Sequence, residues 1–252
     1  MSWHQLKHSD ALVKIRLGFY SVSFVHLAFI ATFLLNVDFT SASDPRLWPY
    51  QTLRWKLITL WFNILALIYY PVSIYCDWRI LAKKTHSNHV QQLNIMRSIC
   101  FTSVLFPITL FSDTLFWRIW IKDRELLAPK TVDEVIPFWT QHSMHTVSMI
   151  CSVIDLLIMP RKKPVRQTLG VSILAAFMGI YLIVCGIDYV RGVNVYPFFE
   201  LLNGFNSLIF LIYMYVETFF YFTVQWIVVD LLWQERDDVN KKEKKSKQFG
   251  PT

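Results

Sequence analysis

Charged side chains are scarce in this sequence. Asp, Glu, Lys and Arg make up only 17% of its 252 residues, whereas soluble domains contain about 25%. Hydrophobic residues make up 54%, and the mean hydropathy is +0.36. The deficit of charge excludes an ordinary soluble domain and indicates that lipid is the solvent. Aromatic residues reach 16%, with 10 Trp, as expected where rings gather at membrane–water interfaces.

Cysteine is rare too, and its positions exclude two further classes of protein. All four cysteines fall in or at the ends of apolar runs, and no C-x-x-C pair occurs: Cys76, Cys100, Cys151 and Cys185. The sequence therefore supports neither a disulfide scaffold nor a thiolate metal site. Gly and Pro number only 7 and 10, with no internal repeat and no low-complexity linker. A single domain over residues 1–252 accounts for the length.

Six apolar stretches are long enough to cross a hydrocarbon core of about 30 Å. They lie at roughly residues 17–37, 57–76, 99–121, 139–159, 169–187 and 205–232. The first is longer than the core of a signal peptide, so we predict a retained span. The fourth is the least apolar, and we keep it because polar helices are common in functional membrane proteins. The predicted fold is an all-α, polytopic membrane bundle of six transmembrane helices.

The basic residues indicate the orientation of this bundle. The net charge of +7 does not indicate a nucleic-acid partner, because the basic residues form no patches interleaved with aromatics. They lie between the apolar runs, about 17 on the side of the termini and about 7 on the other, so the positive-inside rule places both termini in the cytosol. A basic cytosolic tail is predicted at about residues 233–252. We expect the endomembrane system, the endoplasmic reticulum first, or the plasma membrane.

Polar residues inside the predicted spans gather at one depth. Each ionisable group costs about 2.5–3.5 kcal/mol in hydrocarbon and therefore needs a partner or a purpose. The second and fourth spans enter from the non-cytosolic side, and the third span ends there, so we expect the following residues in the outer half: Thr59, Asn63, Asp113, Arg118, His142 and His145. Asp155, in contrast, lies about 15 Å deeper than His145. A cavity open toward the outer leaflet is the simplest arrangement that hydrates or pairs this set.

Three chemistries are compatible with these residue types. His142 and His145, three residues apart on one helical face, could bind a metal with Asp113 as third ligand, although such sites usually have three protein ligands. A hydroxyl activated by an imidazole would give hydrolysis, and a proton or ion relay is the third chemistry. Histidines that only bond to neighbouring helices are the structural alternative, and composition does not separate these readings.

Several short strings occur in a characteristic order along the chain. They are RWKLIT at 54–59, FP at 106–107, FW at 116–117, DRE at 123–125, IPFWTQHSMHT at 136–146 and VYPFFE at 195–200. In order and spacing, this set resembles the androgen-induced and androgen-dependent family of multi-pass membrane hydrolases. The resemblance implies a threonine and a histidine that cleave fatty-acid esters of hydroxy fatty acids, with no cofactor and no metal. The implied partners are membrane lipids and a branched fatty-acid ester substrate.

By the family pattern, Thr59, which closes the W-K-x-x-T string, is the nucleophile, and His145 of the M-H-T string is the base. His142 is then a neighbour rather than the base. The residue that orients His145 is not identified by the pattern. We rank Asp113 first, with Asn63 or His142 as substitutes.

The role of Arg118 and the class of function both stay open at the level of the sequence. Arg118 is an alternative partner of Asp113, or it meets a lipid carboxylate. A non-catalytic lipid-binding or signalling membrane protein that keeps the pocket is the rival to the hydrolase, as is a metal-dependent hydrolase. Departures from the family pattern at Phe62, Ala128 and Gln141 leave the substrate preference open.

Overall fold

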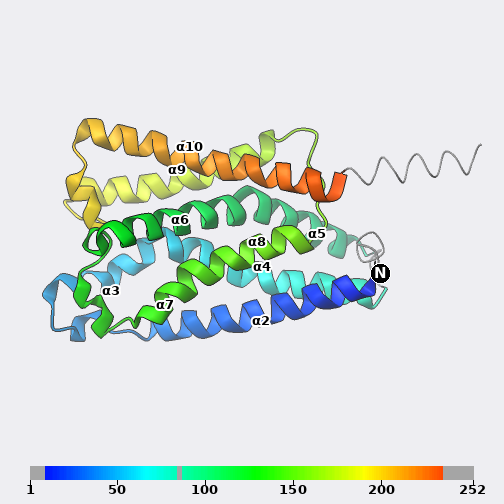
Figure 1. Ribbon diagram of the computed structural model, residues 1–252, viewed down its shortest axis with the longest axis horizontal. Helices are drawn as coiled ribbons and strands as arrows, with labels where there is room; N and C mark the ends of the chain where they lie inside the picture. The colour runs from blue at the N-terminus through cyan, green and yellow to red at the C-terminus, as the bar shows by residue number, and fades with distance from the viewer. Residues whose placement is uncertain (1–8, 84–86, 235–252) are drawn as a thin grey trace, which may run out of the picture.

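A computed structural model describes residues 9–83 and 87–234, which form a bundle of long helices without a strand (Figure 1). The principal helices are α2 (Asp10–Leu35), α4 (Ile58–Leu81), α5 (Asn88–Cys100), α6 (Phe106–Asp123), α8 (Ser148–Ile158), α9 (Thr168–Val190) and α10 (Gly204–Val229). Two helices are short, α3 (Tyr50–Leu53) and α7 (Phe138–His142). Three π-helical segments continue the helices that precede them, η4 (Phe101–Leu105), η7 (Ser143–Val147) and η9 (Asp230–Gln234). The 3-10 turns are η1 (Phe39–Ser41), η2 (Pro45–Leu47), η3 (Arg54–Lys56), η5 (Arg124–Leu126), η6 (Lys130–Glu134) and η8 (Pro197–Leu201).

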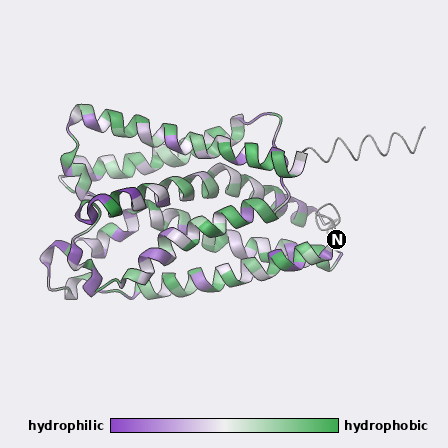
Figure 2. Cartoon of the chain, in the orientation of Figure 1, coloured by the Kyte–Doolittle hydropathy of each residue, from purple (hydrophilic) through white to green (hydrophobic). Residues whose placement is uncertain are grey.

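Five of the predicted spans are present as helices that are long and apolar enough to cross a membrane. Within the described residues these are Asp10–Leu35, Ile58–Leu81, Asn88–Leu126, Thr168–Val190 and Gly204–Trp233. The middle of the bundle is mostly hydrophobic, and hydrophilic residues gather at its end around α3 and the neighbouring loops (Figure 2). The prediction of an all-α integral membrane protein is confirmed.

The fourth predicted span forms a helical run of a different kind. α7, η7 and α8 follow one another without a break from Phe138 to Ile158, which at about 1.5 Å per residue gives about 30 Å. The N-terminal end of α2 and the C-terminal end of α10 lie at the same end of the bundle (Figure 1). An even number of crossings requires this arrangement. The count of six spans, the cytosolic termini and the compartment stay predictions. Residues 235–252 of the predicted basic tail lie outside the described part of the chain.

The third span is the centre of the bundle. In its most apolar window 72% of the residues are buried, against 22–33% in the other four spans. α6 packs between α4, α8 and α10, whereas α2, α9 and α10 turn large apolar side chains outward, toward the expected lipid. The side chains of the first half of α6, residues 106–113, are therefore shielded from lipid and face the neighbouring helices.

Two buried ion-pair clusters join the helices near the predicted cytosolic end. Asp77 of α4 accepts hydrogen bonds from Arg16 at 2.9 Å and from Arg97 at 3.0 Å. Asp155 pairs with Arg161 and accepts a hydrogen bond from Tyr69 at 2.8 Å. Each carboxylate has a cationic partner, which offsets the cost of its burial. As the sequence predicts, Asp155 does not contact the residues of the outer half.

Candidate active site

His145 and Asp113 form a buried, hydrogen-bonded pair between the third and fourth helical runs. Nδ1 of His145 lies 2.9 Å from Oδ1 of Asp113, and the two side chains are 5% and 0% exposed. An ionised carboxylate only accepts hydrogen bonds, so Nδ1 carries the proton and Nε2 is left as the acceptor. Of the three candidates for the orienting residue, Asp113 is the one that contacts His145.

The carboxylate of Asp113 is itself held in place. The hydroxyl of Ser148, one turn after His145, lies 2.5 Å from Oδ2 of Asp113 and 2.5 Å from the carbonyl oxygen of Met144. The ring of Phe116 stacks on the face of the His145 imidazole, with ring centroids 3.6 Å apart and planes tilted by 7°. The imidazole is therefore fixed both at its edge and on its face.

The backbone around His145 is a π-helical turn. η7 covers Ser143–Val147 and interrupts the α-helical run between α7 and α8. A π turn is wider than an α turn and is often found at functional sites. Within this turn His145 is buried, whereas His142, the residue just before the turn, is exposed.

Thr59 is the second residue of α4 and lines the same cavity as His145. This cavity has a volume of about 50 Å³ and is walled mainly by aromatic and aliphatic side chains. The residue before α4, Leu57, provides no side-chain cap, and Ile58 donates its N–H to the hydroxyl of Tyr196 at 3.2 Å. Among the described residues, no hydrogen bond engages the Thr59 hydroxyl or its backbone N–H. Both groups are available to a ligand at the positive end of a helix.

The other predicted site residues have different partners. Asn63 donates to the carbonyl oxygen of Thr59 at 2.8 Å, which is an ordinary contact within the helix. His142 is exposed, and its Nδ1 lies 3.1 Å from the hydroxyl of Thr146. Arg118 pairs with Glu217 at 2.7 Å, so the alternative pairing of Arg118 with Asp113 is wrong. Glu217 lies on α10. Its pairing with Arg118 could not be predicted, because hydropathy does not show which helices are neighbours.

The two histidines do not form the metal site that their spacing suggests. His145 directs Nδ1 to Asp113, whereas His142 directs Nδ1 to Thr146 and packs its ring against Trp117 at 4.8 Å. Within residues 9–83 and 87–234, no group of three or more His, Cys, Asp or Glu side chains is placed to hold a metal ion. The geometry does not favour the metal-dependent reading.

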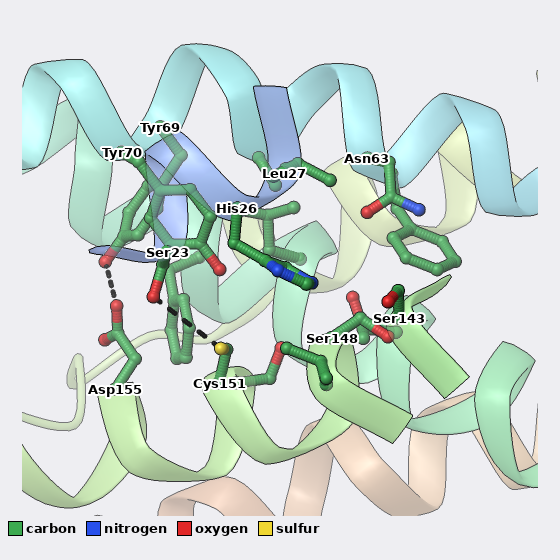
Figure 3. Close-up of a pocket in the computed structure, with 17 residues that line it drawn as sticks. Ser23, His26, Leu27, Asn63, Tyr69, Tyr70, Ser143, Ser148, Cys151 and Asp155 are labelled. Atoms are coloured by element: carbon green, nitrogen blue, oxygen red, sulfur yellow. Dashed lines mark hydrogen bonds between the residues drawn. The ribbon is translucent and has the colours of Figure 1, made fainter. Parts of the chain in front are cut away.

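Two more cavities adjoin Thr59 and its neighbours. The larger, about 270 Å³, lies between α2 and α4 and is lined by Thr59, Asn63 and mostly apolar residues. A narrower and more polar one, of about 30 Å³, extends deeper between α2, α4 and α8. In Figure 3, His26, Asn63 and Ser148 point into this narrower cavity from three different helices. Thr59 therefore lines both the cavity of His145 and the large apolar one.

Sequence reasoning missed Ser148 and Phe116, which hold the Asp113–His145 pair. A signal for each exists, because Phe116 is three residues after Asp113 and Ser148 is three residues after His145. Residues three or four apart are neighbours on a helix surface. Tyr196 was missed as well, since its contact with the start of α4 joins positions 138 residues apart.

Comparison with known proteins identifies relatives of this chain. The chain is 29% identical to human (Homo sapiens) androgen-dependent TFPI-regulating protein over 66% of this chain and 73% of that protein. It is 31% identical to the mouse (Mus musculus) protein of the same name, over 65% and 70%. With human androgen-induced gene 1 protein it shares 25% identity over 77% and 83%. No solved structure matches the chain.

The sequence model of the FAR-17a/AIG1-like protein family matches residues 15–228. This range contains all the described helical runs except their outermost ends, and it includes Thr59, Asp113 and His145. The resemblance found in the short strings is confirmed, and the chain belongs to the FAR-17a/AIG1-like family.

Proposed function

We propose that this protein is an intramembrane lipid ester hydrolase with Thr59 as nucleophile, His145 as base and Asp113 as the residue that orients His145. The observation that carries the proposal is the 2.9 Å contact of Nδ1 of His145 with Asp113, in a cavity that Thr59 also lines. A hydroxyl, an imidazole and a buried carboxylate are the three groups of nucleophilic acyl transfer. The family resemblance implies the same threonine and histidine.

The chemistry of the first half-reaction follows from these roles. The Thr59 oxygen attacks the ester carbonyl carbon while Nε2 of His145 takes the hydroxyl proton, which contributes about 10²–10⁴ in rate. When the intermediate collapses, the bond from carbonyl carbon to ester oxygen breaks. His145 then gives its proton to the departing hydroxy fatty acid, and the acyl group stays on Thr59.

Water completes the second half-reaction. His145 takes a proton from the water as its oxygen attacks the acyl carbon, and the bond to Thr59 breaks to release the fatty acid and restore the hydroxyl. The negative charge that develops on the carbonyl oxygen in both halves forms beside the first turn of α4. The unpaired N–H of Thr59 and the helix dipole stabilise it there.

Apolar surroundings suit a substrate of two acyl chains joined by an ester near mid-chain. The cavity of Thr59 and His145 and the 270 Å³ cavity beside it are both lined mainly by hydrophobic side chains. Both belong to the predicted outer half of the bilayer, so the chains enter from the side without leaving hydrocarbon. This matching of depth favours branched fatty-acid esters over water-soluble esters.

The proposal is tested with purified protein in liposomes that contain a fatty-acid ester of a hydroxy fatty acid. Wild type is expected to release both fatty acids, and Thr59→Ala and His145→Ala are expected to release neither. His142→Ala is the matched control, because this exposed histidine lies on the same helical run outside the cavity, and it should keep wild-type activity. Turnover that persists in Thr59→Ala would contradict the proposal. Substrate binding without turnover by wild type would favour the lipid-binding alternative.

A further inference from the structure

The large cavity beside Thr59 has one charged residue in its lining. Its walls come from α2 and α4, with Leu27, Ile30 and Leu34 on one side and Leu60 and Ile64 on the other. Apart from Arg54, Thr59 and Asn63, every residue that lines it is apolar or aromatic. An apolar cavity with a single cation suits an amphiphile with one negative charge.

Arg54 lies in η3, just before α4, with its guanidinium over the rings of Phe39 and Trp55, and only part of its hydrogen-bonding capacity is used by the protein. Nη1 donates to the carbonyl oxygens of Leu34, in the last turn of α2, and of Val37, just after α2, at 3.2 Å and 2.9 Å. These two bonds fix the plane of the group. Nε is buried without a hydrogen-bond partner, and among the described contacts Nη2 has none either. The edge formed by Nε and Nη2 therefore has no hydrogen-bond partner among the described residues.

That free edge has the geometry that a carboxylate matches. A guanidinium offers two parallel N–H groups along each edge, and a carboxylate accepts both at once. Among the described residues no carboxylate lies within ion-pair distance of Arg54. Asp38, in the loop after α2, is not paired with Arg54. Its Oδ1 atom accepts hydrogen bonds from the N–H and the hydroxyl of Thr40, which lower the pKa of Asp38 most, and the charge of Arg54 adds a smaller lowering.

We propose that Arg54 binds the free carboxylate of the hydroxy-fatty-acid half of the substrate. This inference rests on the proposed function and assigns the end of the substrate that carries the charge. Arg54 lies just before α4, Thr59 is the second residue of α4, and both line the same cavity. A carboxylate at Arg54 then places an ester several carbons down the same chain next to the Thr59 hydroxyl. Esters with no free carboxylate lack this contact.

Two substrates that differ only in charge test the assignment. One is the branched ester with its free carboxylate, and the other is the same ester with that carboxylate methylated, each in neutral phosphatidylcholine liposomes. Wild type should hydrolyse the free acid about 10- to 100-fold faster in kcat/KM, the range of a charge-assisted hydrogen-bond pair. In Arg54→Gln the ratio of the two rates should fall close to one, and in Arg54→Lys it should take an intermediate value.

Matched variants separate recognition from folding. Arg46 is an exposed arginine of the same predicted outer side, paired with Asp44, and Arg46→Gln should keep the wild-type ratio. Because Arg54 also holds the end of α2, Arg54→Gln should lower the unfolding temperature as well. A fall of both rates by the same factor would mean a structural role and would overturn the proposal, as would a ratio near one in wild type. Added anionic phospholipid that abolishes the ratio would assign the site to a headgroup instead.

A binding measurement keeps this inference distinct from the hydrolase proposal. Trp55 lines the same cavity, so a brominated fatty acid bound there should quench its fluorescence, read as the difference between wild type and Trp55→Phe. The free acid should bind about 10- to 100-fold more tightly than its methyl ester, and Arg54→Gln should remove the difference. This result without any turnover would sustain the carboxylate site and refute the hydrolase. Turnover with equal binding of acid and ester would do the reverse.

Discussion

Replacing Asp113 with asparagine tests the orientation of His145 without changing the size of the buried side chain. Oδ1 of Asp113 lies 2.9 Å from Nδ1 of His145, and the carboxylate is fully buried. An asparagine can turn its NH₂ group toward Nδ1 and donate to it. The ring proton then moves to Nε2, the nitrogen that must accept the proton of Thr59. We therefore expect the imidazole to be held in the tautomer that is inactive as a base.

The magnitude follows from the roles of the two groups. In serine proteases the same change from carboxylate to amide lowers kcat about 10⁴-fold, and general-base catalysis contributes about 10²–10⁴. Asp113→Asn should thus reduce hydrolysis of the branched ester by about 10²–10⁴, measured in liposomes at saturating substrate. Ser148→Ala removes a neighbour of Asp113 but keeps the Asp113–His145 contact. It should cost only about 2- to 10-fold, the net worth of one typical hydrogen bond, because Asp113 still holds Nδ1 of His145.

The result that refutes this reasoning is equally specific. If Asp113→Asn unfolds at the temperature of wild type and still hydrolyses the ester at a similar rate, the carboxylate does not orient the base. An equal loss in Asp113→Asn and Ser148→Ala, accompanied by a lower unfolding temperature in both, would mean that the cluster only supports the fold.

Three more predictions concern packing around the site and the opposite end of the bundle. Phe116→Ala removes the ring stacked on His145 and should lower kcat by about 10- to 100-fold through misplacement of the imidazole; unchanged kcat at equal expression would contradict this. Asp77→Asn leaves two buried arginines without their counter-charge, so unfolding in detergent should become easier by about 3–5 kcal/mol; a shift within error would show that the arginines have other partners. Gly170→Ala should destabilise by about 1–3 kcal/mol, because a Cβ there meets the ring of a neighbouring phenylalanine at 3.2 Å. Gly179→Ala, with nothing within 4 Å, should be neutral or stabilising, and equal melting of the two variants would contradict the close packing of α9.

The membrane fold could be predicted because hydropathy is a local property of each segment. The five long apolar helices coincide with predicted spans, and each is longer than the predicted stretch; Ser9 caps α2 and Asn203 caps α10. The fourth run was harder, since Gln141, His142 and His145 lower its hydropathy. In the folded chain His145 pairs with Asp113, and the exposed His142 lies next to the hydroxyl of Thr146. The π turn at Ser143–Val147 leaves no simple mark in the sequence.

The candidate site could be predicted in its residues but not in its contacts. Strings and depth placed Thr59, Asp113 and His145 in one layer, and the structure brings Asp113 to His145 and places Thr59 in the same cavity. Whether His145 or Arg118 pairs with Asp113 depends on how each helix is rotated about its axis, and neither hydropathy nor residue spacing predicts that rotation. The ion pair of Arg118 with Glu217 could not be predicted for the same reason. The two residues are 99 positions apart in the sequence and meet only because α6 packs on α10.

The most direct measurement is the identification of the residue that a fluorophosphonate probe modifies in the membrane-embedded protein. The protein is labelled in liposomes, digested, and the modified peptide is sequenced by mass spectrometry. We predict a single adduct on the oxygen of Thr59, absent from His145→Ala and strongly reduced in Asp113→Asn. An adduct on any other residue, or labelling that persists in Thr59→Ala, would contradict the assignment of Thr59 as the nucleophile.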